Sequence, residues 1–145
     1  MKADRSGPFL QKSLAELGRK YRLTAIYAFG SRADEMAKGL RNAKVDSEYP
    51  ESDLDIGVLP EARLDITAKV ELALALEELF NVSRVDLVVL SEAPPFLALD
   101  IVRGELLYVS DADAEAEYQL YILRRAGDLA PWQHERWQMF VEAEA

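Results

Sequence analysis

Two aspartates stand two positions apart in a segment, Asp53 to Leu59, whose aliphatic residues favour a β-strand. Because side chains alternate between the two faces of a strand, Asp53 and Asp55 are expected to project from the same side. Carboxylates held this close repel each other, and a cation between them removes the repulsion. A third aspartate, Asp86, lies in another apolar segment, Ser83 to Leu90, and completes a magnesium site if the two strands are neighbours.

Three carboxylates of this kind suit nucleotidyl transfer, in which two Mg²⁺ ions roughly 3.5 to 4 Å apart clamp the attacking and leaving oxygens. The chain has no cysteine and one histidine, which excludes disulfides, thiolate zinc sites and multi-histidine sites and leaves oxygen ligands. In this interpretation Asp53 and Asp55 bridge the two ions, and Asp86 binds the ion that lowers the pKa of the acceptor hydroxyl. The reaction then needs no histidine base.

A glycine and a serine follow the predicted strand Leu23 to Phe29, and helix-forming residues come directly after them. Because Gly30 has no side chain, phosphate oxygens can approach the backbone amides that open the next helix. Ser31 adds a hydroxyl donor, and Arg32 can neutralise phosphate charge in the transition state. These three residues are the predicted nucleotide-binding seat.

Each motif also has a simpler interpretation, which the residues alone leave open. Gly30 and Ser31 fit a turn and a helix N-cap, the Asp53 and Asp55 pair fits a solvated strand end, and Asp86 fits a surface or ion-paired residue. What favours the site is the order: a strand, Gly-Ser, a helix, an Asp-x-Asp on a strand and an aspartate on a further strand, all within one small domain.

The remaining segments have to position these residues. We expect one domain, with a core over residues 1–110 and a C-terminal helical extension over residues 111–145. The alternation of strands and helices predicts an α/β (α+β) fold, a mixed sheet flanked by helices. Besides the strands above, we expect a helix over 9–21, a helix opening at 31, a loop over 39–52, a largely buried helix over 64–80, a short helix over 96–103, a strand over 106–109 and a helix over 111–129 that Pro131 interrupts before a last helix over 132–141.

The net charge of the chain limits the classes of partner that it is expected to bind. The formal net charge of −9 argues against a protein that grips long nucleic acid directly, because such binding depends on clustered Lys and Arg. A nucleotide chelated by magnesium is compatible, since the metal carries the positive charge. No apolar run approaches the roughly 20 residues that span a bilayer, and the N-terminus does not look like a secretory signal, so we expect no membrane contact and a cytoplasmic location.

Three stretches together resemble the signature of the DNA polymerase beta-like nucleotidyltransferase superfamily. They are Ala-Phe-Gly-Ser-Arg at 28–32, Ser-Asp-Leu-Asp-Ile-Gly-Val at 52–58 and Val-Asp-Leu-Val-Val-Leu at 85–90. The short chain and the stretch Ile-Val-Arg-Gly-Glu-Leu-Leu-Tyr at 101–108 resemble more narrowly the minimal nucleotidyltransferases, the MntA-type antitoxins of HEPN/MNT toxin–antitoxin pairs. The resemblance runs from about Leu23 to the helix after Asp111.

This resemblance implies the nucleotidyltransferase fold, ATP as substrate, and transfer of AMP to a tyrosine hydroxyl of a cognate HEPN-domain toxin, which is thereby silenced. The chain departs from the family in two places: Asp53 comes 22 positions after Ser31 rather than about a dozen, which indicates an insertion near Glu35 to Glu51, and Asp34 stands where relatives often have a basic residue. Two alternatives stay open, a small-molecule acceptor such as an aminoglycoside and an antitoxin that acts by stoichiometric binding alone. The oligomeric state is also open, as a homo-oligomer or a hetero-oligomer with the toxin.

Overall fold

The computed structural model describes residues 7–30 and 53–144, with side chains described as far as Leu129. The helix expected from Ser31, the loop over 39–52 and the insertion near Glu35 to Glu51 lie outside the described residues. In chain order the elements are α1 (Gly7–Lys20), β1 (Leu23–Phe29), β2 (Leu54–Pro60), α3 (Ile66–Phe80), β3 (Val85–Val89), the 3-10 turn η2 (Leu90–Glu92), α4 (Pro95–Val102), β4 (Glu105–Val109) and α5 (Ala112–Glu144).

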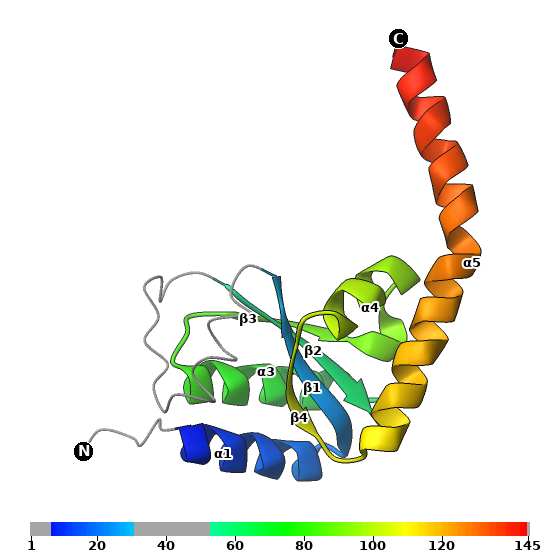
Figure 1. The fold of residues 1–145 in the computed structure, drawn as a ribbon. Helices are drawn as coiled ribbons and strands as arrows, with labels where there is room; N and C mark the ends of the chain where they lie inside the picture. The colour runs from blue at the N-terminus through cyan, green and yellow to red at the C-terminus, as the bar shows by residue number, and fades with distance from the viewer. Residues whose placement is uncertain (1–6, 31–52, 145) are drawn as a thin grey trace.

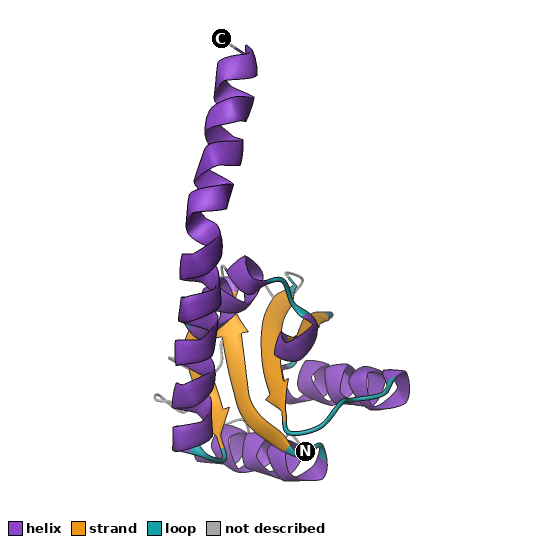
Figure 2. Ribbon diagram, turned by 90° about the vertical axis from the view of Figure 1, so that its right-hand side faces the viewer, coloured by secondary structure: helices purple, strands orange, loops and turns teal. Residues whose placement is uncertain are grey.

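The described strands form one mixed sheet in the order β3-β2-β1-β4. β1 runs antiparallel to both β2 and β4, and β2 runs parallel to β3, to which it is connected through α3. The sheet lies between two helical layers, with α1 and α3 on one face and α4 and the first part of α5 on the other (Figure 1). Figure 2 shows the same arrangement from the side. The predicted fold class is confirmed.

Side chains of the central strand β1 alternate between two apolar cores. Ile26 and Ala28 pack in the core beneath α1 and α3, whereas Ala25 and Tyr27 pack in the core beneath α4 and α5. This alternation follows from the period-two geometry of a strand that is covered on both faces. The two-sided burial explains why the whole of Leu23 to Phe29 is apolar except for Thr24.

The prediction that the helix over 64–80 is largely buried is wrong. α3 buries Leu72, Leu76, Leu79 and Phe80, but Ile66, Val70 and Leu74 on its outer side are 79%, 53% and 57% exposed. The reason is that α3 is the outermost layer on its side of the sheet, so only the inner stripe of the helix meets the core.

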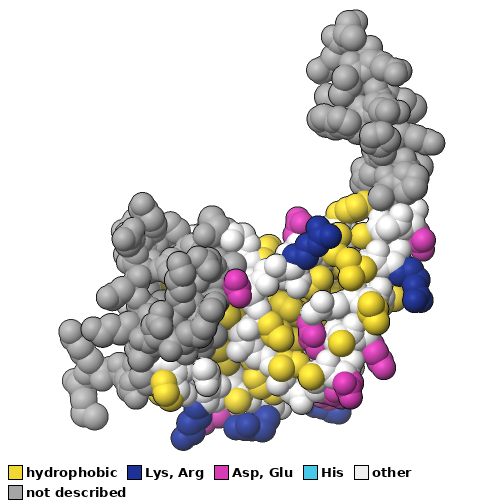
Figure 3. Space-filling model, viewed as in Figure 1, with side chains coloured by type: hydrophobic (Ala, Val, Ile, Leu, Met, Phe, Trp, Pro, Cys, Tyr) yellow, Lys and Arg dark blue, Asp and Glu magenta, His cyan; other side chains and the backbone are white. Residues whose placement is uncertain are grey.

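The predicted break at Pro131 is also wrong, because α5 is one helix from Ala112 to Glu144. A proline removes one backbone donor and crowds the preceding turn, which bends a helix more readily than it ends one when the turns on both sides form. α5 rises well beyond the sheet (Figure 1). Its lower part carries exposed Leu120, Tyr121 and Leu123, and apolar side chains gather over α4 and this part of α5 in Figure 3.

A buried polar contact fixes the start of α5 to the sheet. The Tyr27 hydroxyl of β1 and the Gln119 amide both donate hydrogen bonds to the carboxylate of Glu115, which is 6% exposed. Burial and the neighbouring Glu115 carboxylate raise the pKa of Tyr27 far above its usual range, so the hydroxyl keeps its proton and stays a donor. Among the described helices, none combines the length and the apolar character that a membrane crossing requires.

Candidate active site

Asp55 and Asp86 lie side by side on neighbouring strands. β2 and β3 are parallel, and in their register the Cα of Asp55 is paired with the Cα of Asp86. The residues before and after Asp55, Leu54 and Ile56, are fully buried in the core, so the carboxylate projects from the other side of the strand. The condition set in the sequence analysis, that the strand of Asp86 lies beside the Asp-x-Asp strand, is therefore met.

The electrostatics of this pair are unfavourable for two negative charges. Burial is the largest cause that raises the pKa of Asp55, followed by the negative charges of Asp86 and Asp53 and by a hydrogen bond with the Asp86 side chain. The shift means that the protein around Asp55 disfavours its ionised form. A cation at this position would remove that penalty for Asp55.

Asp53 is near this pair without completing a compact cluster. It precedes the first residue of β2 and is exposed, although its charge still acts on Asp55. Within residues 7–30 and 53–129, no group of three His, Cys, Asp or Glu side chains is gathered closely enough to hold a metal ion. Mg²⁺ is commonly bound by one or two carboxylates together with substrate phosphates and water, so the donor chemistry of the Asp55 and Asp86 pair fits it.

Gly30 follows the last residue of β1 and lies against Asp55. Phe29 is the register partner of Asp55, and Gly30 follows it in the left-handed region with φ of 75°. A Cβ atom built on Gly30 would lie 2.5 Å from Oδ2 of Asp55, closer than such atoms can approach. The backbone at the predicted phosphate-binding position therefore lies against the Asp55 carboxylate, and glycine is favoured there. Ser31 and Arg32 lie outside the described residues, and their roles stay predictions.

One charged neighbour of the site was not considered in the sequence analysis. Arg84 Nε lies 3.2 Å from Oδ1 of Asp86. The simpler interpretation of Asp86 as an ion-paired residue is thus confirmed. The same residue also lies beside Asp55. The sequence signal for this ion pair was the spacing of Arg84 and Asp86, because residues two apart on a strand project from the same face.

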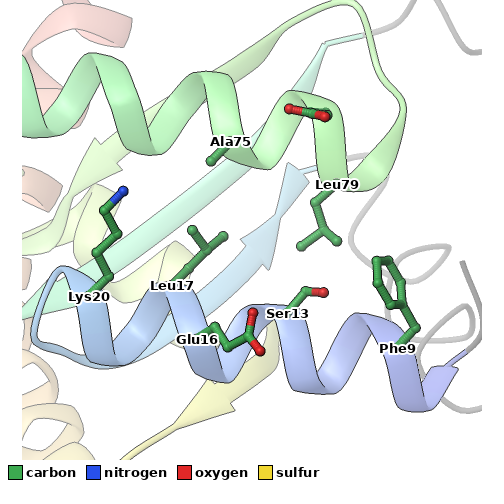
Figure 4. A pocket seen from close by; sticks show the side chains of 8 residues that line it. Phe9, Ser13, Glu16, Leu17, Lys20, Ala75 and Leu79 are labelled. Carbon is green, nitrogen blue, oxygen red and sulfur yellow. The ribbon is translucent and has the colours of Figure 1, made fainter. Parts of the chain in front are cut away.

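A groove elsewhere on the molecule does not contribute to this site. It has a volume of about 350 Å³ and lies between α1 and α3, as Figure 4 shows. Its floor is apolar and its rim is polar, and neither includes the carboxylates or Gly30. The residues that line it are Phe9, Ser13, Glu16, Leu17, Lys20, Ala75, Glu78 and Leu79.

Comparison with known proteins matches the chain to one family and to several solved structures. The family model described as "Polymerase beta, Nucleotidyltransferase" matches residues 12–113, which include β1, β2 and β3. No curated protein sequence matches the chain significantly. Among solved structures, the chain is similar to a chain of the crystal structure of the toxin-antitoxin with AMP-PNP, with 25% identity, a TM-score of 0.67, and coverage of 93% of this chain and 98% of that one.

A second solved structure is similar over almost the whole length. It is that of a tri-AMPylated Shewanella oneidensis HEPN toxin in complex with MNT antitoxin, with 25% identity and a TM-score of 0.63. The match covers 96% of this chain and 99% of that chain. A chain of the crystal structure of the toxin-antitoxin MntA-HepT is 23% identical, with a TM-score of 0.64 and coverage of 95% of this chain and 99% of that chain, and it shows the same fold.

Proposed function

Because the chain belongs to the polymerase beta nucleotidyltransferase family, we propose that it transfers AMP from ATP to a tyrosine hydroxyl of a cognate HEPN-domain toxin. The observation that carries this proposal is the carboxylate pair Asp55 and Asp86 on adjacent strands, with Gly30 lying against Asp55. Two further findings support it: one similar structure contains AMP-PNP, and another contains an AMPylated HEPN toxin with an MNT antitoxin.

The site residues divide the work between the nucleotide and its metal. Gly30 lets the phosphates approach the backbone, and we assign Ser31 and Arg32 to phosphate binding. Asp53, Asp55 and Asp86 are the candidate ligands of Mg²⁺, up to two ions, which when bound neutralises phosphate charge and lowers the pKa of the acceptor hydroxyl. The three carboxylates repel the negatively charged phosphates unless a cation lies between them. They would therefore limit the positions that the phosphates can take.

The reaction itself is a displacement at the α-phosphorus of ATP. The tyrosine oxygen forms a bond to this phosphorus while the bond from it to the bridging oxygen of the β-phosphate breaks. Pyrophosphate leaves, and the phenolic proton passes to water. We assign no histidine base to this step, because Mg²⁺, when bound, would lower the pKa of the acceptor hydroxyl.

The acidic character of the chain supports a basic protein acceptor. The formal net charge is −9, and a potential of this sign speeds the encounter with a positively charged partner such as an RNA-cutting toxin. The same charge opposes approach of free polyanions.

The test is intact mass spectrometry of the candidate toxin after incubation with the chain, Mg²⁺ and each NTP. We expect a mass increase by whole AMP units with ATP, and peptide fragmentation that places the AMP on tyrosine. Asp53→Asn with Asp55→Asn, and separately Asp86→Asn, should abolish the transfer. Asp100→Asn is the matched control, because Asp100 is an exposed carboxylate on α4 outside the site.

Two outcomes would contradict the proposal. Toxin neutralisation that is unchanged by the Asp53→Asn and Asp55→Asn double substitution would favour stoichiometric binding. Nucleotide transfer to an aminoglycoside-type hydroxyl in the absence of any protein partner would favour the small-molecule reaction.

A further inference from the structure

The main chain at Arg84 is fixed by hydrogen bonds beside the carboxylate pair. Its carbonyl oxygen accepts a hydrogen bond of 3.0 Å from the backbone N–H of Leu54, the residue before Asp55. The next backbone N–H, that of Val85, donates a bond of 3.0 Å to the Glu77 side chain on α3. The main chain at Arg84 is therefore tied both to the start of β2 and to the helix that covers the sheet.

From this fixed backbone the Arg84 side chain reaches Asp86. The distance from Arg84 Nε to Oδ1 of Asp86 is 3.2 Å, and the side chains are 68% and 41% exposed. The contact is to one carboxylate oxygen, Oδ1, and the same carboxylate also forms a hydrogen bond with the Asp55 side chain. The guanidinium is planar and always charged, so it restricts rotation of the carboxylate more than a flexible ammonium would.

We propose that Arg84 is a positioning residue that orients the Asp86 carboxylate for divalent metal binding beside Asp55. This inference rests on the proposed function, because it presumes that the pair holds Mg²⁺. Groups that hydrogen-bond to a metal-binding carboxylate commonly fix its orientation, and their loss lowers metal affinity about 10- to 100-fold.

The positive charge of Arg84 acts in the opposite direction, since it repels an incoming cation. That repulsion is weakened by water, because two thirds of the side chain is exposed and screened. The restriction on carboxylate rotation is not screened. Removal of Arg84 should therefore weaken metal binding, whereas a purely electrostatic role predicts tighter binding.

The experiment measures Mn²⁺ binding to the full chain by electron paramagnetic resonance of free Mn²⁺, without nucleotide or toxin. Arg84→Met removes the charge and the donors but keeps an unbranched chain, and we expect it to weaken Mn²⁺ binding about tenfold. Arg84→Lys, which keeps only the charge, should recover a minor part of the loss. Arg22→Met is the matched control, because Arg22 pairs with Glu61 at 3.6 Å, is 73% exposed and lies at the other end of β2.

A double-mutant cycle separates orientation from a general effect. In an Asp86→Asn background, Arg84→Met should cause no further loss of Mn²⁺ affinity, because the carboxylate that it orients is gone. The urea midpoint of unfolding should be the same for Arg84→Met and the unsubstituted chain, since an exposed ion pair adds little stability.

Unchanged or tighter Mn²⁺ binding by Arg84→Met, an equal loss in the Asp86→Asn background, or no Mn²⁺ binding by the unsubstituted chain would each overturn the inference. The assay contains no ATP and no acceptor. If the unsubstituted chain fails to modify the toxin while the Mn²⁺ results hold, the proposed function is wrong and the role of Arg84 in metal binding stands.

Discussion

Replacement of Gly30 by alanine perturbs the backbone and the carboxylate pair at the same time. Gly30 has φ of 75°, a region that costs a residue with a Cβ about 1–2 kcal/mol. The added methyl group would also lie 2.5 Å from Oδ2 of Asp55. Because that oxygen is the end of a side chain, it can rotate away, and the collision is relieved by displacing the carboxylate rather than by deforming the sheet.

The two consequences have different sizes. The left-handed backbone alone sets a loss of about 1–2 kcal/mol in the free energy of unfolding, and rotation of Asp55 adds little to it. Function is more sensitive, because a misplacement of about 1 Å at a reacting centre can lower a rate by about 100-fold. We therefore expect Gly30→Ala to remain folded and to lose at least about 99% of its transfer activity.

Gly127→Ala is the matched control, because it makes the same chemical change in an exposed turn of α5. A Cβ atom there has no neighbour within 4 Å, and alanine stabilises a helix interior relative to glycine by about 0.5–1 kcal/mol. Urea unfolding should thus shift in opposite directions for the two variants, while only Gly30→Ala loses AMP transfer in the mass assay. Full activity of Gly30→Ala, or equal stability changes for both substitutions, would refute the assignment of Gly30 to the site.

Three further predictions concern single side chains, one in the site and two outside it. Tyr27→Phe removes the hydroxyl that donates to the buried Glu115 carboxylate and should lower the free energy of unfolding by about 1–3 kcal/mol in urea titrations. Burial, followed by the charges of Asp86 and Asp53, raises the pKa of Asp55 in the folded chain. The native state therefore holds a proton that the unfolded chain has released, and the contribution of Asp55 to stability falls as the pH rises above about 4. Asp55→Asn should accordingly gain stability over the unsubstituted chain through that range, in metal-free urea titrations, and the gain should level off once Asp55 is ionised in the folded chain. Asp65→Ala removes the N-cap of α3, whose side chain accepts a 2.7 Å bond from the Ala68 N–H, and should cost about 1 kcal/mol by the same measurement.

The sequence was sufficient to predict the strands and the aspartates of the site, but not the order of the strands. Strong apolar runs identified the strands. The meeting of Asp55 and Asp86 was left conditional on their strands being neighbours, and the parallel pairing of β2 and β3 meets that condition, with the two residues in register. Gly30 was predicted from its place at a strand end, and its contact with Asp55 agrees with that position.

Other features depend on information that local patterns do not contain. α3 is apolar nearly all round, and only the number of layers stacked on it decides that Val70 and Leu74 are exposed. A proline signals a lost backbone donor, and whether the helix continues depends on the turns around it, as it does in α5. The ion pair of Arg84 with Asp86 was visible only as a spacing of two residues, a pattern too common to single out.

The energetics of the site argue that the Asp55 carboxylate serves a ligand and not the fold. Asp55 is flanked by core residues, and burial, followed by the charges of Asp86 and Asp53, raises its pKa, so the folded chain disfavours the ionised carboxylate. Gly30, by contrast, is the residue type that its left-handed backbone favours, and it leaves room for that same carboxylate. The ionised Asp55 side chain therefore weakens the isolated chain, and it becomes favourable once a cation binds beside it. The stabilisation of the folded state on binding then grows with ligand concentration as RT ln(1 + [L]/Kd), which is about 2.7 kcal/mol at 100 times the Kd.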